Sequence, residues 1–351
     1  MRYLSDLKHF PEYDNHELVC EIEDKNIGLH AYIAIHNTNL GPATGGTRFF
    51  FYNTKDEAIR DALKLSKAMT YKCALAGVPY GGGKGVIIGN PNNIKTDELL
   101  KSYAKAINEL NGKFTTGEDI GLTKNDIMVL SSESKYVNGR PQKAGELGPW
   151  AALGVFRAIQ SVLDFKFKSS DINGRTFAVK GLGKVGLTLC QLINENGGNV
   201  IGADISQDAI EKARTIVQDI KIVDSSEIHK QKVDVYCPCA LGNEFNENTI
   251  QELNCEIICG GANNQLTSPD IGEYFHKNKI VYVPDYVANA GGLINIVSEM
   301  SENGYNKEDV KNKIDTISNT VKKILEIAQE NNEPTNIVAD RLAQKIINEN
   351  K

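Results

Sequence analysis

Hydrophobic and polar residues alternate from Leu29 to Ile35, and this period of two predicts a half-buried strand. From Lys55 to about Cys73 the apolar residues recur every three or four positions, which predicts an amphipathic helix. A second helix is expected from Thr96 to about Leu110, and Thr123 begins a capping box for a third. Short strands are expected at residues 49–52, 86–88 and 113–115. The glycines of 81–85 are expected to form a loop.

Beyond residue 150 the pattern becomes a regular alternation of buried strands and helices. The expected strands are Thr176–Lys180, Asn199–Ala203, Val233–Tyr236, Cys255–Cys259 and Ile280–Val283. Helices are expected at about 151–163, 307–331 and 336–348. Such an alternation is typical of a parallel, doubly wound sheet of the Rossmann type.

Glycine and proline crowd into the segment between these two patterns, at Gly139, Pro141, Gly145, Gly148 and Pro149. A cluster of this kind is typical of a hinge or an interdomain connection. The sequence therefore predicts an α/β protein of two domains, residues 1–145 and a Rossmann domain at residues 146–332.

Composition narrows the class of protein. The chain has 351 residues, of which 41% are hydrophobic, a formal charge of -6 and a pI of about 5.7. An acidic chain without a run of Lys or Arg is a poor candidate for binding nucleic acid or an anionic membrane. No apolar stretch is long enough to span a bilayer, and no signal peptide is expected. Seven cysteines, an odd count, favour reduced thiols and a cytoplasmic location.

A dinucleotide-binding motif follows the strand at 176–180. Gly181, Gly183 and Gly186 form a GxGxxG turn, and an apolar helix comes next. The first glycine permits the tight turn, the second lets the backbone approach a pyrophosphate, and the third permits close helix–strand packing. Asp204, at the end of the next strand, can accept the hydroxyls of a ribose. Because nothing basic follows it, NAD is favoured over NADP. The alternative is a glycine turn that binds no nucleotide.

Three residues of the first half suit the chemistry of amine oxidation. This reaction needs a cation for the substrate carboxylate, a group that activates water, a carboxylate that exchanges protons at nitrogen, and a hydride acceptor. Lys72, Lys84 and Asp119 fit the first three needs. Each has an ordinary alternative, because a lysine at a helix end is usually solvated and a glycine-rich segment is often only a turn. The segment is not a phosphate-binding P-loop, since Gly85 follows Lys84 where Ser or Thr is required.

These segments closely resemble the glutamate/leucine/phenylalanine/valine dehydrogenase family, in its leucine/phenylalanine branch. The resemblance rests on the glycine-lysine segment 78–91 and extends over nearly the whole chain, through 40–48, 69–72, 238–242, 262–266 and 284–292. It implies that Lys72 binds the substrate carboxylate, that Lys84 activates water and that Asp119 transfers protons. It also implies a catalytic N-terminal domain, completed by the helix at about 333–351, across a cleft from the NAD-binding domain.

The resemblance further implies which residues line the two binding sites. Those expected at the substrate are Lys72, Leu40, Gly41, Gly117, Asn264, Asn289, Leu293 and Ile296. Those expected at NAD are Gly181, Leu182, Gly183, Lys184, Val185, Gly186, Asp204, Ile205, Cys239, Ala240, Leu241 and Asn264. Ala151 stands where the family usually has a threonine that contacts the nicotinamide amide. Relatives are generally homo-oligomers built through the first domain.

Pocket residues bear on the substrate. Glutamate-specific relatives hold the distal carboxylate with a lysine and a serine, where this chain has Leu40 and Ile296. A glutamate carboxylate buried there without a partner would cost several kcal/mol. The combination of Gly117 and Leu293 resembles the residues at these positions in the aromatic-specific members. Gly117 leaves volume for a ring. The expected reaction is reversible oxidative deamination of an apolar L-amino acid, branched-chain or aromatic, to its 2-oxo acid and ammonia.

Two other interpretations carry less weight. Cys237, Cys239, Cys255 and Cys259 do not have the spacing of a zinc site, and the histidines form no metal motif, so no metal is expected. A catalytically silent NAD-binding sensor or assembly protein is the alternative from another class. Such a protein has no need to retain Lys72, Lys84 and Asp119 together.

Overall fold

The computed structural model describes residues 1–140, 144–301 and 304–350. These residues form two compact units. The first holds residues 1–145, 296–305 and 343–351, and the second holds residues 146–295 and 306–342. Pro141, one of the residues expected at the hinge, lies outside the described residues.

The described residues of the first unit form a mixed sheet in the order β1-β2-β3-β6-β4-β7, with β5 also beside β6. Its strands are β1 (Arg2–Tyr3), β2 (Leu18–Asp24), β3 (Leu29–Asn37), β4 (Ala43–Thr44), β5 (Thr47–Phe50), β6 (Gly81–Ile88) and β7 (Phe114–Thr115). Strand β6 is antiparallel to β3 and parallel to β4 and β5. It therefore lies in the middle of the sheet.

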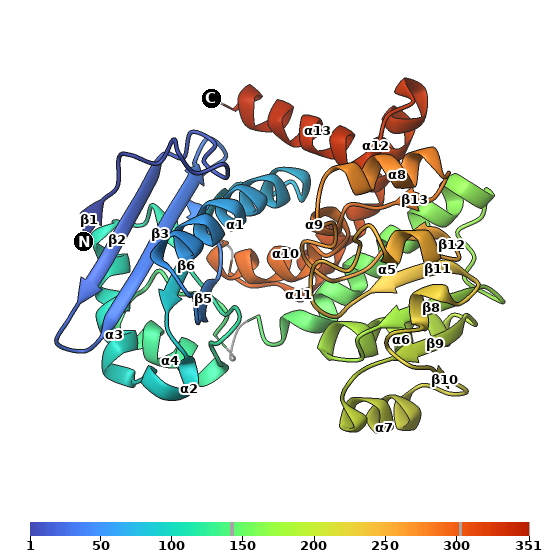
Figure 1. Cartoon of the computed structure of the whole chain (residues 1–351), viewed down its shortest axis with the longest axis horizontal. Helices are drawn as coiled ribbons and strands as arrows, with labels where there is room; N and C mark the ends of the chain where they lie inside the picture. The colour runs from blue at the N-terminus through green and yellow to red at the C-terminus, as the bar shows by residue number, and fades with distance from the viewer. Residues whose placement is uncertain (141–143, 302–303, 351) are drawn as a thin grey trace. The chain divides into compact units, whose positions relative to one another are not determined.

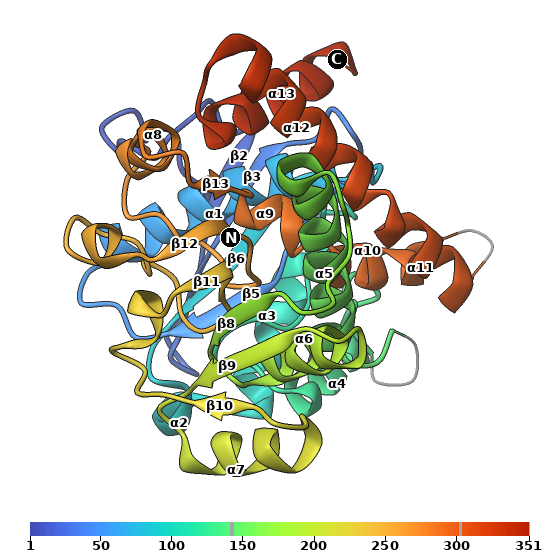
Figure 2. The ribbon, with the colours of Figure 1, turned by 90° about the vertical axis from the view of Figure 1, so that its right-hand side faces the viewer.

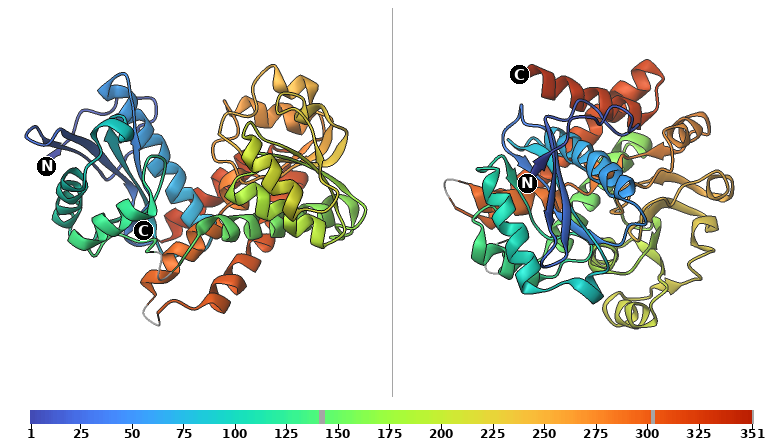
Figure 3. Two further views of the ribbon diagram at one scale, coloured as in Figure 1. Left: turned by 90° about the horizontal axis from the view of Figure 1, so that it is seen from below. Right: turned by 60° about the vertical axis from the view of Figure 1, so that its left-hand side comes forward.

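Helices cover both faces of this sheet. Helix α1 (Lys55–Leu75) packs on one face (Figures 1 and 3), where Leu63 and Val86 share a hydrophobic cluster. Helices α3 (Asp97–Glu109) and α4 (Lys124–Glu133) cover the other face, and α2 (Pro91–Ile94) precedes them. Thr96 caps α3, and the capping box predicted at Thr123 is present at the start of α4.

The described part of the second unit holds a six-stranded parallel sheet, seen in Figure 2, in the order β10-β9-β8-β11-β12-β13. Its strands are β8 (Thr176–Lys180), β9 (Asn199–Ala203), β10 (Lys221–Ile222), β11 (Val233–Pro238), β12 (Cys255–Ile258) and β13 (Val281–Tyr282). Counted along the chain from β8, this is the 3-2-1-4-5-6 order of the Rossmann fold. The predicted doubly wound sheet is confirmed.

Helices of the second unit pack on the faces and ends of this sheet. They are α5 (Leu147–Phe167), α6 (Lys184–Glu195), α7 (Gln207–Ile216), α8 (Asp270–Lys277), α9 (Asp285–Ala288), α11 (Lys307–Asp315) and α12 (Ile317–Asn331), with short 3-10 turns at Ile228–Lys230 and Thr249–Glu252. Phe275 of α8 packs with Tyr236 and Ile258 on one face of the sheet. Cys259 Sγ faces the Val155 carbonyl of α5.

Two helices, α10 (Gly291–Val297) and α13 (Thr335–Glu349), are shared between the units, and Ser298–Met300 forms a 3-10 turn after α10. Residues 333–342 belong to the second unit, which differs from the expectation that the whole segment 333–351 completes the first domain. Side chains explain the division. Thr335 donates a hydrogen bond to the Tyr282 carbonyl of the second unit, whereas Gln344 donates one to Tyr71 of the first.

Candidate functional site

Strands β4 and β5 lie in one line along β6, and the gap between them falls at Gly45 and Gly46. Ala43 and Thr44 pair with Gly81 and Gly82, and pairing resumes at Thr47. A Cβ on Gly45 would lie 1.9 Å from the carbonyl oxygen of Gly83. One on Gly46 would lie 2.8 Å from the carbonyl oxygen of Glu118 and 3.0 Å from Asp119 Cβ. Two glycines therefore let the loop after β7 approach the middle of β6.

The glycine-rich segment is a buried strand, so the prediction of a loop at residues 81–85 is wrong. The glycines serve close packing. A Cβ on Gly82 would lie 2.1 Å from the backbone nitrogen of Thr70 in α1, and one on Gly83 would lie 2.6 Å from the Phe114 ring. Helix α1 and the Phe114 side chain thus pack on opposite faces of β6. Lys84 is the one long side chain of the segment 81–85. Because side chains alternate between the two faces of a strand, Lys84 lies on the same face as Gly82, which is the face covered by α1.

Lys84 and Asp119, the two predicted catalytic residues, are in contact. Lys84 Nζ donates a hydrogen bond to Asp119 Oδ2. The Lys84 side chain is 8% exposed and that of Asp119 21%, so the ion pair is largely shielded from water. Asp119 Oδ1 accepts the N–H of Ile120 at 2.8 Å. The carboxylate is therefore fixed on both oxygens.

A third charged residue, Arg48 of β5, belongs to this cluster and is missed by the sequence reasoning. Arg48 Nε lies 3.6 Å from Asp119 Oδ2, and Nη1 donates to Asp61 Oδ2 of α1 at 2.9 Å. Burial favours a raised pKa for Asp119, but the charges of Lys84 and Arg48 outweigh it and lower that pKa to about 2. Asp119 is thus an anion near neutral pH while Lys84 and Arg48 carry their charges.

Other predicted residues of the first unit lie at the end of α1 and between β3 and β4. Lys72 lies half-buried in the last turn of α1, one turn after Met69, whose Cγ lies 3.3 Å from the position of a Cβ on Gly45. Leu40 and Gly41 form the turn between β3 and β4. Gly41 has a φ of +137°, and a Cβ there would lie 2.3 Å from the carbonyl oxygen of Pro79.

Gly117 and Ile296 are neighbours in the first unit. A Cβ on Gly117 would lie 3.0 Å from Ile296 Cδ1 and 3.3 Å from the carbonyl oxygen of Asn138. The volume that Gly117 leaves is therefore filled by the Ile296 methyl group, and the expected room for an aromatic ring is not open. Rotation of Ile296 about its side-chain bonds would open it. Asn138 donates a hydrogen bond to Met300 Sδ beside this pair.

In the second unit the GxGxxG turn connects β8 directly to α6. Gly181 has a φ of +93°, and a Cβ there would lie 2.7 Å from the backbone nitrogen of Ala240. A Cβ on Gly186 would lie 1.8 Å from the carbonyl oxygen of Gly181, whereas one on Gly183 would meet nothing within 4 Å. Leu182, Lys184 and Val185 complete the turn and the first residues of α6. Open space therefore lies in front of Gly183, at the amino end of the helix.

Side chains from the next strand ends gather around this turn. Asp204, after β9, accepts the N–H of Leu182 at 2.6 Å and that of Ser206 at 2.8 Å. Cys239, after β11, donates its N–H to the Lys180 carbonyl, and burial raises the pKa of its thiol to about 12. Two large apolar side chains beside these residues are unusually exposed, Ile205 at 93% and Leu241 at 80%.

Asn264 and Asn289 lie in neighbouring segments of the second unit. The Asn264 carbonyl accepts the N–H of Asn243, which joins the loop after β11 to the loop after β12. Asn289 Nδ2 donates to the Gly261 carbonyl at 3.2 Å and to Asn263 Oδ1 at 2.8 Å. Its Oδ1 is buried without a hydrogen-bond partner among the described residues. Leu293, on α10, is buried at 8% exposure.

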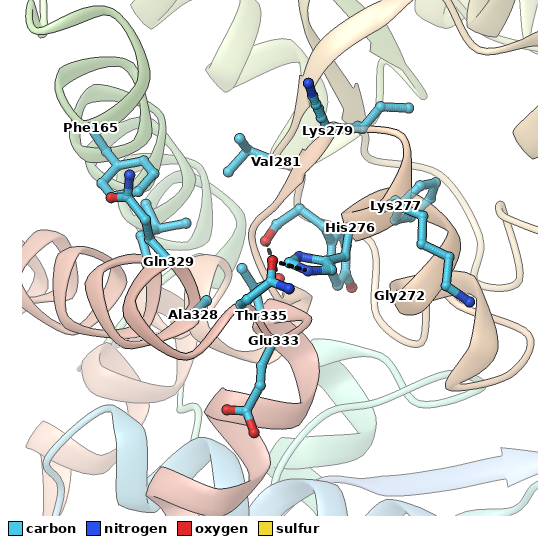
Figure 4. Close-up of a pocket in the computed structure, with 15 residues that line it drawn as sticks. Phe165, Gly272, His276, Lys277, Lys279, Val281, Ala328, Gln329, Glu333 and Thr335 are labelled. Carbon is cyan, nitrogen blue, oxygen red and sulfur yellow. Dashed lines mark hydrogen bonds between the residues drawn. The ribbon is translucent and has the colours of Figure 1, made fainter.

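A separate pocket of about 740 Å³ lies elsewhere in the second unit (Figure 4). Phe165, His276, Val281 and Gln329 are among the residues that line it, and none of the residues predicted to bind substrate or dinucleotide does so. His276 Nε2 lies 3.2 Å from Asn332 Oδ1 at its wall. This pocket is therefore separate from the candidate site.

The cysteines and other metal-binding residues form no centre that the structure describes. All seven cysteines are free thiols. Among residues 1–140, 144–301 and 304–350, no three His, Cys, Asp or Glu side chains are placed to hold a metal ion. Within those same ranges no helix combines the length and the apolar character needed to cross a membrane.

Comparison with known proteins decides the family. Residues 15–138 match the model of the Glu/Leu/Phe/Val dehydrogenase dimerisation domain, and residues 204–350 match the Glutamate/Leucine/Phenylalanine/Valine dehydrogenase model. Leucine dehydrogenase of Bacillus subtilis is 41% identical over 345 residues, which are 97% of this chain and 93% of that protein. The chain belongs to the glutamate/leucine/phenylalanine/valine dehydrogenase family.

Other members of this family are similar to the same extent. L-Tryptophan dehydrogenase of Nostoc punctiforme is 42% identical over 337 residues, covering 96% of this chain and 94% of that one. Its crystal structure superposes with a TM-score of 0.83 over 95% of this chain and 96% of that chain. Phenylalanine dehydrogenase of Caldalkalibacillus thermarum is 39% identical over 91% of this chain and 88% of that protein.

Membership of the dehydrogenase family confirms three predictions. The resemblance to the family, the two-domain α/β fold and the assignment as an amino-acid dehydrogenase acting on CH–NH₂ donors are all confirmed. The enzyme is of the leucine/phenylalanine/tryptophan dehydrogenase type. The alternative of a silent dinucleotide-binding protein is not favoured.

Proposed function

We propose that this enzyme catalyses the reversible oxidative deamination of an apolar L-amino acid, using NAD and water and releasing the 2-oxo acid and ammonia. The observation that carries the proposal is the buried contact between Lys84 and Asp119. Lys84 can take a proton from water, and Asp119 can exchange protons at the substrate nitrogen. The contact places these two groups side by side.

We assign the roles from this geometry and from the family. Lys72 binds the substrate α-carboxylate from the end of α1, and Asn264 and Asn289 orient the reacting groups. Lys84 takes the proton of the water that adds to Cα, and Asp119 exchanges protons with the departing nitrogen. The unpaired Asn289 Oδ1 supports such a role, because a buried acceptor without a partner is costly unless a ligand donates to it. A bound nicotinamide dinucleotide supplies the hydride acceptor.

The residues around the GxGxxG turn fit NAD. Open space at Gly183 leaves room for a pyrophosphate, and the free N–H groups at the start of α6 face it. Asp204 stands where a ribose would be held, and its negative charge would repel the 2′-phosphate of NADP. The exposed Ile205 and Leu241 offer apolar surfaces to the flat rings of the cofactor, and Cys239 and Ala240 line the same loop.

The proposed substrate is apolar and leans toward aromatic. Leu40 and Ile296 provide no partner for a second carboxylate, which disfavours glutamate. Gly117 and Leu293 favour a ring, provided that Ile296 rotates away from Gly117. Leucine-type substrates fit the Ile296 position as it stands.

We infer that the enzyme is a homo-oligomer. The first unit, proposed as the substrate and oligomerisation domain, carries exposed apolar side chains at Phe51 (60%), Ile120 (48%) and Met128 (50%), which a second copy would cover. A particle mass of one chain, 38.5 kDa, would contradict this. Seven free thiols fit the reducing cytoplasm, which we propose as its location.

Steady-state kinetics test the function. NADH formation at alkaline pH is measured with leucine, valine, phenylalanine, tryptophan and glutamate, and kcat/KM should be far higher for an apolar substrate than for glutamate. Lys84→Ala should abolish turnover and leave NAD binding nearly unchanged. The control is Lys105→Ala, which removes an exposed lysine of α3 and should retain full activity. A kcat/KM highest for glutamate, or substantial activity in Lys84→Ala, would overturn the proposal.

A further inference from the structure

Arg48 and Lys84 act on the same oxygen atom of Asp119. Lys84 Nζ donates to Oδ2, and Arg48 Nε lies 3.6 Å from it. The two cations come from adjacent parallel strands, where Arg48 of β5 pairs with Val86 of β6. The Arg48 side chain is 19% exposed. A single carboxylate is therefore placed between two largely buried cations.

The Arg48 guanidinium is fixed from the side away from Asp119. Asp61 Oδ2 of α1 accepts its Nη1 at 2.9 Å and also accepts the Tyr52 hydroxyl at 2.6 Å. Arg48 Nε itself is buried and has no hydrogen-bond partner among the described residues. A buried N–H donor left unpaired costs free energy, so its retention needs an explanation. Asp119 Oδ2 is the nearby acceptor, and a small movement of the Arg48 Nε–H would form a hydrogen bond to it.

The proposed chemistry supplies that explanation. If Lys84 takes a proton from water, it must be neutral during part of the cycle, and Asp119 then loses its nearest counter-charge. An ionised carboxylate in a shielded site is unfavourable without a cation beside it. A guanidinium does not deprotonate in proteins, so Arg48 keeps its charge throughout.

We propose, on the basis of the proposed function, that Arg48 is a positioning residue that holds Asp119 ionised while Lys84 is neutral, its Nε–H closing on Oδ2 as Lys84 releases it. Asp61 and Tyr52 hold Arg48 for this task. Arg48 touches neither the substrate nor the reacting atoms in this account. It acts through Asp119.

The proposal predicts that substitutions at Arg48 and at Asp61 change the proton affinity of Lys84 in opposite directions. The titratable groups that act on Asp119 and Arg48 are Lys84 from β6, Asp61 from α1, and Tyr52 after β5. Arg48→Met removes a positive charge from this group, so Lys84 should bind its proton more tightly. Asp61→Asn removes a negative charge, so Lys84 should release its proton more readily.

The test is the pH profile of kcat/KM for deamination of the best apolar amino acid. In Arg48→Met the acid limb should move to higher pH by about one unit, and kcat should fall roughly 10- to 100-fold at constant amino-acid KM. Arg48→Lys should restore most of the limb position, because it keeps the charge. Asp61→Asn should move the limb to lower pH. NAD binding should be unchanged in all three variants.

Several outcomes would overturn this role. One is a loss of kcat in Arg48→Met while the acid limb of the pH profile stays in place. Another is an acid limb that moves in the same direction in Arg48→Met and in Asp61→Asn. Should Arg48→Met fail to fold, Asp61→Asn still decides, because a limb that stays in place or moves to higher pH in that variant would overturn the role. Failure of the proposed function looks different. It would appear as no turnover of any amino acid by the unaltered enzyme, or as an active Lys84→Ala, whatever Arg48 does.

Discussion

At the scale of single residues, burial and charge compete in this enzyme, and neighbouring groups decide which prevails. Asp119 is shielded from water, yet Lys84 and Arg48 keep its pKa at about 2. Only one of these partners could be predicted from the sequence. Both Lys84 and Arg48 lie in segments that resemble the family, but Arg48 and Asp119 are far apart in the chain, and their pairing leaves no local pattern. A long-range ion pair of this kind appears only when the strands are aligned.

Gly117 is the residue at which a small change should alter substrate preference. In Gly117→Ala the new methyl group would lie 3.0 Å from Ile296 Cδ1, and it would take up the volume that a ring needs once Ile296 has rotated away. We expect kcat/KM for phenylalanine and tryptophan to fall about tenfold or more relative to leucine. The measurement is the ratio of kcat/KM values for each pair of substrates.

A second substitution checks the cause of that change. Ile296→Val removes the Cδ1 methyl group, so Gly117→Ala combined with Ile296→Val should regain part of the aromatic activity lost by Gly117→Ala alone. If the ratio of aromatic to leucine activity is the same in Gly117→Ala as in the unaltered enzyme, Gly117 does not shape the side-chain pocket.

At the scale of elements, the pattern of side chains predicts strands well where side chains exist. Strands β8 and β9 have the predicted bounds, because runs such as Thr176–Lys180 are short, apolar and flanked by turn residues. Strand β6 begins with three glycines, which carry no alternation to detect. Its strand conformation depends instead on tertiary contacts with Thr70 and Phe114. The glycines carry no side chains, so they give no pattern from which a strand can be predicted. For the same reason, neighbouring groups can pack closely on both faces of β6.

The two glycines of the GxGxxG turn at Gly183 and Gly186 should respond differently to alanine. A Cβ on Gly183 meets nothing within 4 Å, and its φ of -73° suits any residue. Gly183→Ala should therefore leave the melting temperature unchanged or slightly higher, while it weakens NAD binding by about tenfold or more because the methyl group fills the space of the pyrophosphate. Binding is measured by calorimetry and stability by thermal unfolding.

Gly186→Ala is the matched comparison. Its Cβ would lie 1.8 Å from the carbonyl oxygen of Gly181, so α6 must move away from β8. We expect destabilisation by roughly 1–3 kcal/mol or more. Full NAD affinity in Gly183→Ala would show that the cofactor does not approach this part of the turn.

At the scale of the whole molecule, the response of stability to acid should be set by two buried histidines of the first unit. His16 Nδ1 accepts the N–H of Asp14, and its Nε2 lies 3.0 Å from the Leu63 carbonyl, so the ring is bound in its neutral form. Burial lowers the pKa of His16 to about 4, and it also lowers the pKa of His36, whose ring centroid lies 4.9 Å away. The folded state therefore favours the neutral form of both rings.

The sign of the effect follows from proton binding. Above pH 6.5 both the folded and the unfolded His16 are neutral and contribute nothing to the pH dependence. Between pH 6.5 and about 4 the unfolded chain binds a proton that the folded chain excludes, so the free energy of unfolding falls as pH falls, by roughly 3 kcal/mol for His16. The carboxylates of Glu21 and Asp119, whose pKa values are lowered to about 2, contribute stability that is lost only at lower pH. The window above pH 4.5 thus reports mainly on the histidines.

His16→Gln isolates this contribution, because glutamine can donate to the Leu63 carbonyl but cannot be protonated. Stability is measured by urea unfolding, followed by circular dichroism, at about pH 7.5, 6.0 and 5.0, which cover the range in which His16 excludes a proton on folding. The loss of stability with falling pH should be shallower in this variant than in the unaltered enzyme. His9→Gln, at an exposed position, should keep the steep dependence. An equally steep loss in His16→Gln would mean that the proton excluded on folding is not that of His16. The acid sensitivity of the first unit would then arise at another group, with His36 next to be tested, since burial also lowers the pKa of its ring.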